Sequence, residues 1–276
     1  NGGGENVIKN LSWYSSVGGY QSTMDGSFYS TIGNGKTNTI NISHYSVIGG
    51  GLTNKVFNSS NYSSIGGGYI NTISGSSQAS IVGGVSNEIN DSNNANIGGG
   101  NNNHINENSL SSFIANGQSN SISASTYSSI VGGTGGVIEG TQSGSIIGGQ
   151  NNHIHSADFS TIINGHNNNI THDHSVILGT ANRTTSLSYT TYLDGLDIDS
   201  VGQGGARYLK YHGALANPGI NKVLTSIDNL GNAVWGNPAG VSNLTGDEVV
   251  VSARTIGCVL TLTTNSGNTI TANTCT

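Results

Sequence analysis

The amino-acid sequence predicts an all-β protein, in which a parallel β-roll (β-solenoid) of about eleven coils precedes a small C-terminal β module. Three observations predict this fold. A motif close to Y-S-x-I-x-G-G-x-x-N-x-I recurs every 14 to 17 residues, most often every 16, as far as Thr184. Two aliphatic columns run through the repeats, and one glycine recurs between them. A nearly constant repeat length is the sequence signature of stacked coils.

The two aliphatic columns predict two short strands in each coil. The first column consists of Val17, Ile32, Ile48, Ile65, Ile81, Ile97, Ile114, Ile130, Ile146, Ile162 and Val176. The second column, about eight residues further on in each repeat, consists of Met24, Ile40, Val56, Ile73, Ile89, Ile105, Ile122, Ile138, Ile154 and Ile170. We expect both columns to face the interior of the roll.

A recurring glycine and a recurring asparagine lie between the columns. The glycine follows the first aliphatic residue by three positions, at Gly35, Gly51, Gly68, Gly84, Gly100, Gly117, Gly133, Gly149, Gly165 and Gly179. Such a position needs a positive φ or has no room for a Cβ atom. The asparagine precedes the second aliphatic residue by two positions, at Asn38, Asn54, Asn71, Asn87, Asn103, Asn120, Asn152, Asn168 and Asn182, with Gly136 as the exception. We expect these amides to form a ladder that caps the turns.

Two further columns precede the first aliphatic residue. Small residues stand two positions before it, at Ser15, Ser30, Ser46, Ser63, Ala79, Ala95, Ser112, Ser128, Gly144 and Ser160. Aromatic residues often stand one position earlier still, at Tyr14, Tyr29, Tyr45, Tyr62, Tyr127 and Phe159. Repeated Tyr, Asn and Ser side chains offer a surface for sugars or proteins, but packing between coils also explains their regularity. We expect most of them to be structural.

The short repeat predicts self-association. Two strands of three to four residues and two turns enclose only a thin apolar strip, which is a poor core for a monomer. We expect identical chains to cover a further face of the roll, most simply around a threefold axis. With parallel strands about 4.8 Å apart, the coils would form a rod about 50 Å long.

The repeats resemble the YadA-like head of trimeric autotransporter adhesins. The matching residues read S-S-I-G-G-G-Y-I-N-T-I at Ser63 to Ile73 and S-S-I-V-G-G-T-G-G-V-I at Ser128 to Ile138. Similar repeats occur in phage and viral fibre proteins. The resemblance implies a left-handed roll in a homotrimer. This chain has isoleucine where the adhesin heads usually have alanine, which implies a wider roll.

Composition is typical of an extracellular or virion-surface fibre. The 276 residues include 43 glycines and 2 prolines, only 8% of them are charged, and the net charge is −6. No Lys or Arg occurs between Val56 and Asn182, so the repeats lack the cations that nucleic-acid binding requires. No apolar run approaches the length of a membrane span, and we expect no membrane insertion within this segment.

The sequence divides into four parts. Residues 1–184 form the repeat domain, 185–205 a neck, 206–240 a hairpin connector and 241–276 a C-terminal β-hairpin module. The connector, from Asn217 to Trp235, is similar to a G-K-V-L-T-S-D-x-x-G-N-A-x-W element of phage tail fibres. We expect a hairpin that turns through Asp228 to Gly231, with Trp235 as a candidate for the trimer junction.

The two cysteines lie near the C-terminus. If Ser266 and Gly267 form a two-residue turn, Cys258 and Cys275 face each other as a non-hydrogen-bonded pair, which suits a cross-strand disulfide. We expect an intrachain disulfide, which favours an oxidising compartment. Two free thiols or a covalent link between subunits are the alternatives.

Candidate catalytic and metal-binding groups have simpler explanations. The histidines that cluster in the sequence are His153, His155, His166, His172 and His174. They share no ligand spacing, so we expect ordinary surface histidines and no metal or other cofactor. Single, scattered carboxylates occur at Glu88, Asp91, Glu107, Glu139, Asp158 and Asp173. Because glycan cleavage needs a carboxylate pair, we expect no enzymatic activity, and a glycan-degrading tailspike is the least favoured function.

The sequence therefore predicts a homotrimeric attachment fibre, an adhesin or receptor-binding fibre, located outside the cell, on a cell surface or on a virion. Its partners would be copies of itself and a host-surface glycan or protein receptor. The residues assigned to the structural repeat are Ile65, Gly68, Asn71, Ile73, Ile81, Gly84, Asn87 and Ile89. The alternative is a structural subunit that polymerises into a surface filament through exposed strand edges.

Overall fold

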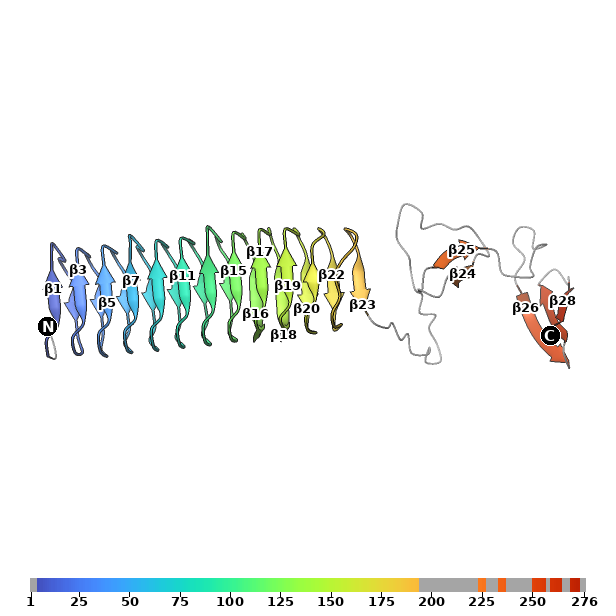
Figure 1. The fold of residues 1–276 in the computed structure, drawn as a ribbon, viewed down its shortest axis with the longest axis horizontal. Helices are drawn as coiled ribbons and strands as arrows, with labels where there is room; N and C mark the ends of the chain where they lie inside the picture. The colour runs from blue at the N-terminus through green and yellow to red at the C-terminus, as the bar shows by residue number, and fades with distance from the viewer. Residues whose placement is uncertain are drawn as a thin grey trace. The chain divides into compact units, whose positions relative to one another are not determined.

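The computed structural model describes residues 4–193 and five strands further along the chain, at 223–226, 233–236, 250–256, 259–264 and 269–273. The chain divides into two compact units, Asn1–Asp197 and Ile198–Thr276, which are described separately. The first unit is a parallel β-roll, as the repeat predicts, and its strands succeed one another along the roll from β1 to β23 (Figure 1). The described residues contain no helix long and apolar enough to cross a membrane.

Two parallel sheets form the roll. Sheet A consists, in order, of β1 (Val7–Lys9), β3 (Thr23–Asp25), β5 (Thr39–Asn41), β7 (Lys55–Phe57), β9 (Thr72–Ser74), β11 (Glu88–Asn90), β13 (His104–Asn106), β15 (Ser121–Ser123), β17 (Val137–Glu139), β19 (His153–His155) and β21 (Asn169–Ile170). Sheet B consists of β2 (Ser16–Val17), β4 (Thr31–Ile32), β6 (Val47–Ile48), β8 (Ser64–Ile65), β10 (Ser80–Ile81), β12 (Asn96–Ile97), β14 (Phe113–Ile114), β16 (Ser129–Thr134), β18 (Ser145–Gln150), β20 (Thr161–Ile163), β22 (Val176–Leu178) and β23 (Thr191–Leu193). Each coil contributes one strand to each sheet, except that no strand of sheet A lies between β22 and β23 in the described part of the chain.

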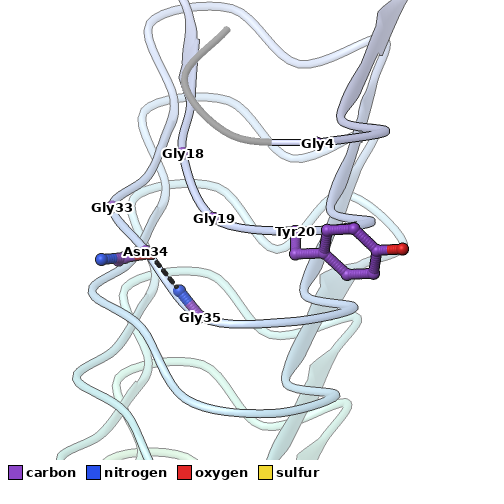
Figure 2. Close-up of a pocket in the computed structure, with 7 residues that line it drawn as sticks. All are labelled: Gly4, Gly18, Gly19, Tyr20, Gly33, Asn34 and Gly35. Atoms are coloured by element: carbon purple, nitrogen blue, oxygen red, sulfur yellow. Dashed lines mark hydrogen bonds between the residues drawn. The ribbon is translucent and has the colours of Figure 1, made fainter.

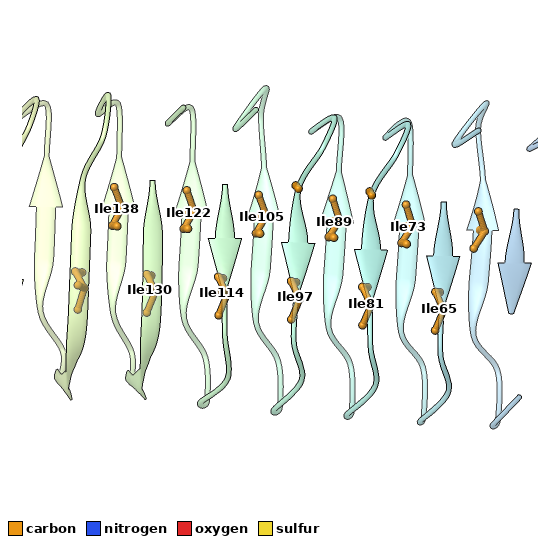
Figure 3. Close-up of a cluster of buried hydrophobic side chains, with 14 of the residues drawn as sticks. Ile65, Ile73, Ile81, Ile89, Ile97, Ile105, Ile114, Ile122, Ile130 and Ile138 are labelled. Carbon is orange, nitrogen blue, oxygen red and sulfur yellow. The ribbon is translucent and has the colours of Figure 1, made fainter. Parts of the chain in front are cut away.

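The two aliphatic columns form the core. Ile81 in sheet B pairs in register with Ile65 and Ile97, and Ile89 in sheet A pairs with Ile73 and Ile105. Figure 3 shows these isoleucines as two rows on alternate strands, and their side chains are fully buried. Burial of one such side chain stabilises the fold by about 1.5–3 kcal/mol. The predicted core residues are therefore confirmed along most of the roll.

The recurring glycine lies where the backbones of successive coils approach most closely. Gly84 has a φ of +94°, and a Cβ atom there would lie 2.3 Å from the carbonyl oxygen of Gly100. Gly68 has the same relation to Gly84, with a φ of +93° and a contact of 2.2 Å. Tyr45, by contrast, has a φ of +56°, in the left-handed region that a side chain can adopt. Both reasons predicted for the glycine, the positive φ and the lack of room, are present.

The asparagines form a buried ladder beside these glycines. The Asn87 amide nitrogen donates to the carbonyl oxygens of Gly83, at 3.0 Å, and Gly100, at 3.1 Å. Its Oδ1 atom accepts from the backbone N–H of Asn103 in the next coil, at 3.1 Å, and from the Asn103 side-chain amide, at 3.2 Å. Each amide thus satisfies backbone groups of its own coil and of the next coil, as turn capping requires.

Replacement of Asn87 with alanine is expected to lower the free energy of unfolding by about 2–4 kcal/mol, because buried hydrogen-bonding groups lose their partners. Chemical denaturation followed by circular dichroism measures the change. The ladder is interrupted at Gly136, where an added asparagine provides the opposite test. The N–H of Gly136 donates to Asn120 Oδ1 at 2.9 Å, but Gly136 has no side-chain amide to continue the ladder. Gly136→Asn is expected to stabilise the roll by about 1 kcal/mol. A loss below about 0.5 kcal/mol for Asn87→Ala would contradict this role of the ladder.

The last coils differ from the predicted phase by one residue. Ile177, and not Val176, pairs with Ile162 and is fully buried. In the same coil Thr180 takes the place predicted for Gly179, because the Thr180 carbonyl oxygen accepts from the N–H of His166 at 3.2 Å. Arg183 takes the place predicted for Asn182, because its N–H donates to Asn168 Oδ1 at 3.0 Å. The coil from Ile162 to Ile177 has 15 residues, one more than the 14-residue step predicted from Ile162 to Val176, so each position in this coil lies one residue later than predicted.

The roll also extends beyond the predicted boundary at residue 184. Strand β23 pairs in parallel with β22, and Tyr192 packs against the core at the position of the first aliphatic column. Residues 185–193, predicted as the start of the neck, therefore belong to the roll. A tyrosine in an otherwise aliphatic column conceals this last coil in the sequence. The rest of the predicted neck, residues 194–205, lies outside the described residues.

The second unit contains two antiparallel sheets among its described residues. Strands β24 (Val223–Ser226) and β25 (Ala233–Gly236) form the predicted hairpin, in which Ser226 pairs with Ala233. This register is the one that a turn through Asp228 to Gly231 gives. Trp235 lies in β25 opposite Leu224, and its role at a trimer junction stays a prediction.

A three-stranded sheet consists of β26 (Val250–Ile256), β27 (Val259–Thr264) and β28 (Thr269–Asn273). The sequence predicted only the hairpin of the last two strands. Thr263 pairs with Thr269, whereas a two-residue turn at Ser266 and Gly267 would pair Thr264 with Thr269, so the predicted register is wrong by one residue. Cys258 and Cys275 lie outside the described residues, and their disulfide stays a prediction.

Candidate functional site

The aromatic column forms an exposed ladder on the first coils. The rings of Tyr14, Tyr29, Tyr45 and Tyr62 stack in succession, with centroids 4.9, 5.1 and 4.9 Å apart and interplanar angles of 7°, 7° and 2°. These tyrosines are 79, 51, 47 and 61% exposed, so the core does not need them. The centroid spacing follows the separation of parallel strands, about 4.8 Å. The roll thus sets the interval between the rings.

The hydroxyl groups of these four tyrosines are the polar ends of the exposed ladder. Within residues 4–193 no protein group is hydrogen-bonded to the hydroxyls of these four tyrosines. Because the rings cover one another's faces, the ladder presents ring edges and a row of hydroxyls outward. A phenolic hydroxyl both donates and accepts hydrogen bonds. The row is therefore a regular array of hydrogen-bonding groups along the roll.

A second aromatic row lies one residue before the tyrosines. Trp13 and Phe28 have ring centroids 5.9 Å apart, and Phe28 stacks on His44 at 4.6 Å. The N–H of Phe28 donates to His44 Nδ1 at 3.0 Å, which leaves the proton of a neutral His44 on Nε2. Trp13 is 61% exposed. The first coils therefore carry an aromatic strip two residues wide.

A groove adjoins this strip. Its volume is about 470 Å³, and its lining residues are Asn10, Leu11, Asp25, Gly26, Phe28, Asn41, Ile42 and His44. Leu11 and Ile42 are exposed apolar side chains, and both have a positive φ. The Asn10 amide donates to Asp25 Oδ1 at 2.7 Å on the groove wall. An apolar floor with a few fixed polar groups is typical of a small-ligand site.

A shorter aromatic cluster lies near the other end of the roll. His174 stacks on Tyr189, with centroids 4.5 Å apart, and is tilted against Phe159 at 5.2 Å. The coils between the two clusters carry Gln78, Asn94, Ser111, Tyr127 and Ser143 at the same position. Tyr127 therefore has no aromatic neighbour in its column, although it is 65% exposed.

The structure separates the predicted site residues into two classes. Ile65, Ile73, Ile81 and Ile89 are buried in the core, and Asn71 and Asn87 are buried in the ladder; Gly68 and Gly84 lie at the close contacts between coils. All eight are structural. The tyrosines instead lie outside the roll. Sequence reasoning missed Trp13, Phe28 and His44, although their intervals of 15 and 16 residues match the repeat.

A second surface lies along the glycines that directly precede the recurring positive-φ glycine in each coil. At Gly67, Gly83 and Gly99 a Cβ atom would meet nothing within 4 Å, and φ is not positive. The roll itself therefore gives no reason for glycine at these positions, which we call the open glycines. At the first coils this edge has a hollow of about 510 Å³ beside Tyr20, with Gly4, Gly18, Gly19, Gly33, Asn34 and Gly35 around it (Figure 2).

An aliphatic stripe continues next to this edge in the later coils. Ile147, Ile163, Leu178 and Leu193 follow one another in register on neighbouring strands of sheet B. They are 41, 38, 37 and 37% exposed. Earlier coils have Gly33, Gly49 and Gly66 at this position. This column of sheet B is therefore apolar in the later coils, whereas in the first coils glycines leave the backbone without side chains.

The carboxylates are less scattered than the sequence indicates. Asp158 and Asp173 lie in neighbouring coils, where Asp173 Oδ1 accepts from the N–H of Asp158 at 2.8 Å. Asp158 Oδ1 accepts in turn from the N–H of Gln142 at 2.7 Å. These carboxylates thus have capping roles. Glu139 lies beside two histidines, 3.3 Å from His155 Nδ1 and 3.9 Å from His153 Nε2.

Comparison of the chain with models of known protein families gives no match, and comparison with curated proteins gives none either. The interpretation of the site therefore depends on its geometry and chemistry.

Proposed function

We propose that the protein is a homotrimeric attachment fibre at an extracellular, cell or virion surface, and that its aromatic strip binds a surface glycan. The observation that carries this proposal is the exposed ladder of Tyr14, Tyr29, Tyr45 and Tyr62, whose hydroxyls have no protein partner within residues 4–193. A structural role in the core would bury these side chains. Their exposure favours a role in binding.

The spacing of the ladder favours an extended polymer as the ligand. Ring centroids 4.9–5.1 Å apart place successive hydroxyls at an interval close to the length of one sugar residue in an extended polysaccharide. Sugar hydroxyls are donors and acceptors that match phenolic hydroxyls. The adjacent groove adds Asn10, Asp25 and Asn41 as polar groups and Phe28 as an apolar surface. A glycan chain parallel to the roll would contact several coils at once.

A trimer would multiply such contacts. Each chain presents one strip, and linked binding events raise the overall affinity without any new contact. Many fibres on one particle or cell extend the same effect. This mechanism needs only weak binding at each strip, which agrees with a shallow, exposed site.

Removal of the hydroxyls tests the proposal. The variant Tyr29→Phe/Tyr45→Phe/Tyr62→Phe keeps the stacked rings and removes only hydrogen-bonding groups. We expect at least a tenfold loss of binding to immobilised polysaccharides, since each net hydrogen bond contributes about 0.5–1.5 kcal/mol. A glycan screen of the wild-type protein first identifies a bound polysaccharide, and surface plasmon resonance then compares the variants.

Tyr127→Phe is the matched control, because Tyr127 occupies the same column without aromatic neighbours. We expect this variant to bind like the wild-type protein. Absence of glycan binding by the wild-type trimer, or equal binding by the triple variant, would contradict the proposed glycan site. Binding of a protein receptor instead would keep the attachment function and replace its ligand.

A structural filament subunit is the second candidate. Among the described strands β1 is the terminal strand of sheet A, and Val7 and Ile8 on it are exposed. An unpaired parallel edge can accept a strand of another chain. Light scattering and negative-stain microscopy distinguish the two candidates. Discrete trimers support an attachment fibre, whereas long unbranched polymers support a filament.

A further inference from the structure

Two neighbouring strands of sheet A bring together a carboxylate and two imidazoles. Glu139 ends β17, and His155, which ends β19, is its direct partner in the parallel register. His153 precedes His155 by two residues, so both imidazoles lie on the outer face of the sheet, opposite the buried Ile154. Because Ile154 between them is buried, the alternation of side chains along the strand places both histidines on the same outer surface.

The three potential ligand atoms lie close together. Glu139 Oε2 is 3.3 Å from His155 Nδ1 and 3.9 Å from His153 Nε2, and all three ligand atoms lie within 4.8 Å of one another. A tetrahedral ion with ligands at about 2.0–2.2 Å needs its ligand atoms about 3.3–3.6 Å apart. Small side-chain rotations would close the remaining difference, and the exposure of Glu139 and His155 permits them.

The environment of His153 provides independent support. Its Nε2 atom is inaccessible to solvent and has no hydrogen-bond partner among the described residues. Asn169 pairs with His153 on the next strand β21, and its buried Oδ1 atom likewise has no hydrogen-bond partner in the described part of the chain. Buried polar atoms of this kind call for a bound ion or another explanation. His153 is next to the carboxylate, with Nε2 3.9 Å from Glu139 Oε2, and Asn169 lies one strand further along sheet A.

An earlier pair of residues in sheet A has the carboxylate and one imidazole of this cluster but lacks the second imidazole. Glu88 and His104 are partners on β11 and β13, with Oε2 and Nδ1 3.4 Å apart. His104 Nε2 lies 3.2 Å from Asn102 Oδ1, so both of its nitrogens have partners. Among the described residues only the cluster at Glu139 joins three such ligands.

We propose that Glu139, His153 and His155 form a binding site for a divalent transition-metal ion, best matched by Zn²⁺. Two imidazoles and one carboxylate are a ligand set that zinc takes, with a fourth position left for water or another group. The ion would join β17 to β19 on the outside of the roll and would neutralise the carboxylate. This proposal does not depend on glycan binding.

Isothermal titration of the full chain with ZnCl₂ at pH 7 tests the site. We expect one ion per chain at the site, and the single variants Glu139→Gln, His153→Asn and His155→Asn should each weaken binding about tenfold or more, as losses at metal sites typically do. His104→Asn is the matched control and should leave the affinity unchanged. Co²⁺ adds a spectroscopic readout, since a tetrahedral site gives intense visible absorption bands.

Circular dichroism of each variant establishes that the roll is intact, which is expected because the three side chains lie outside the core. Loss of zinc binding and of the Co²⁺ bands in the three variants, with retention in His104→Asn, would support the site. Absence of zinc binding by the wild-type chain would overturn it. Equal affinity in all variants, which is the result of adventitious binding at other histidines, would overturn it as well.

Discussion

Replacement of Gly84 with alanine is expected to lower the free energy of unfolding by about 3 kcal/mol or more, a large effect for a single methyl group. The added Cβ would lie 2.3 Å from the Gly100 carbonyl oxygen and 2.5 Å from the Asn87 amide nitrogen. Neither the carbonyl oxygen nor the amide nitrogen can move away from the added Cβ without breaking a hydrogen bond. The oxygen accepts from the N–H of Val85 at 2.9 Å, and the amide belongs to the buried ladder.

Backbone conformation adds to this cost. Gly84 has a φ of +94°, beyond the left-handed region near +57° that non-glycine residues occupy. Alanine would have to move toward that region, and every hydrogen bond to the next coil would move with it. In a solenoid each coil contacts only its neighbours, so such a defect weakens both interfaces of one coil.

The preceding residue is the matched control. A Cβ atom on Gly83 would have no neighbour within 4 Å in its own chain, so Gly83→Ala is expected to change the stability of the single roll by less than about 0.5 kcal/mol, apart from any contact between chains. Chemical denaturation of both variants, followed by circular dichroism, gives the comparison. Equal stability of Gly83→Ala and Gly84→Ala would show that the contact between coils does not determine the choice of glycine.

Most of the fold follows from the sequence, because a fixed repeat sets the phase of every position. Ile81, Gly84, Asn87 and Ile89 each occupy the predicted place, since one rule describes all coils. The rule fails where neighbouring residues satisfy it equally well. Val176 and Ile177 are both aliphatic, and only the stacking of coils decides that Ile177 is buried.

The candidate sites were harder to predict, because they join residues of different phases. Glu139 precedes His155 by one repeat, and this interval was the available signal for a shared surface. His153 joins them only through the two-residue period of a strand. The aromatic strip was also only partly predictable. The sequence shows that the tyrosines form a column, but it does not show that their side chains are exposed. The burial of a repeated side chain distinguishes a column that stabilises the roll from a column that binds a ligand. The repeat pattern alone does not show whether a side chain is buried.

The triple variant Gly67→Glu/Gly83→Glu/Gly99→Glu is expected to convert the proposed trimer into monomers. The open glycines have room for a side chain within the chain, and Asn34 and Asn116 occupy the corresponding position in other coils. Glycine without an internal reason is typical of a place where another backbone approaches closely. Three carboxylates on such a surface would be buried without partners, which costs several kcal/mol per charge. Light scattering measures the mass of each variant.

The control adds the same charge to the outer face of sheet A, as Thr39→Glu/Thr72→Glu/Ser121→Glu, and should remain trimeric. The choice between these faces depends on what each one presents. Thr39, Thr72 and Ser121 are polar side chains suited to water, whereas the open glycines lie one position after the column that carries the exposed side chains of Ile147 and Ile163. A chain that covers this apolar column would also lie close to the open glycines, where the three introduced carboxylates would be buried. Dissociation of the control variant instead would place the interface on sheet A, and a trimeric glycine variant would exclude the glycine edge.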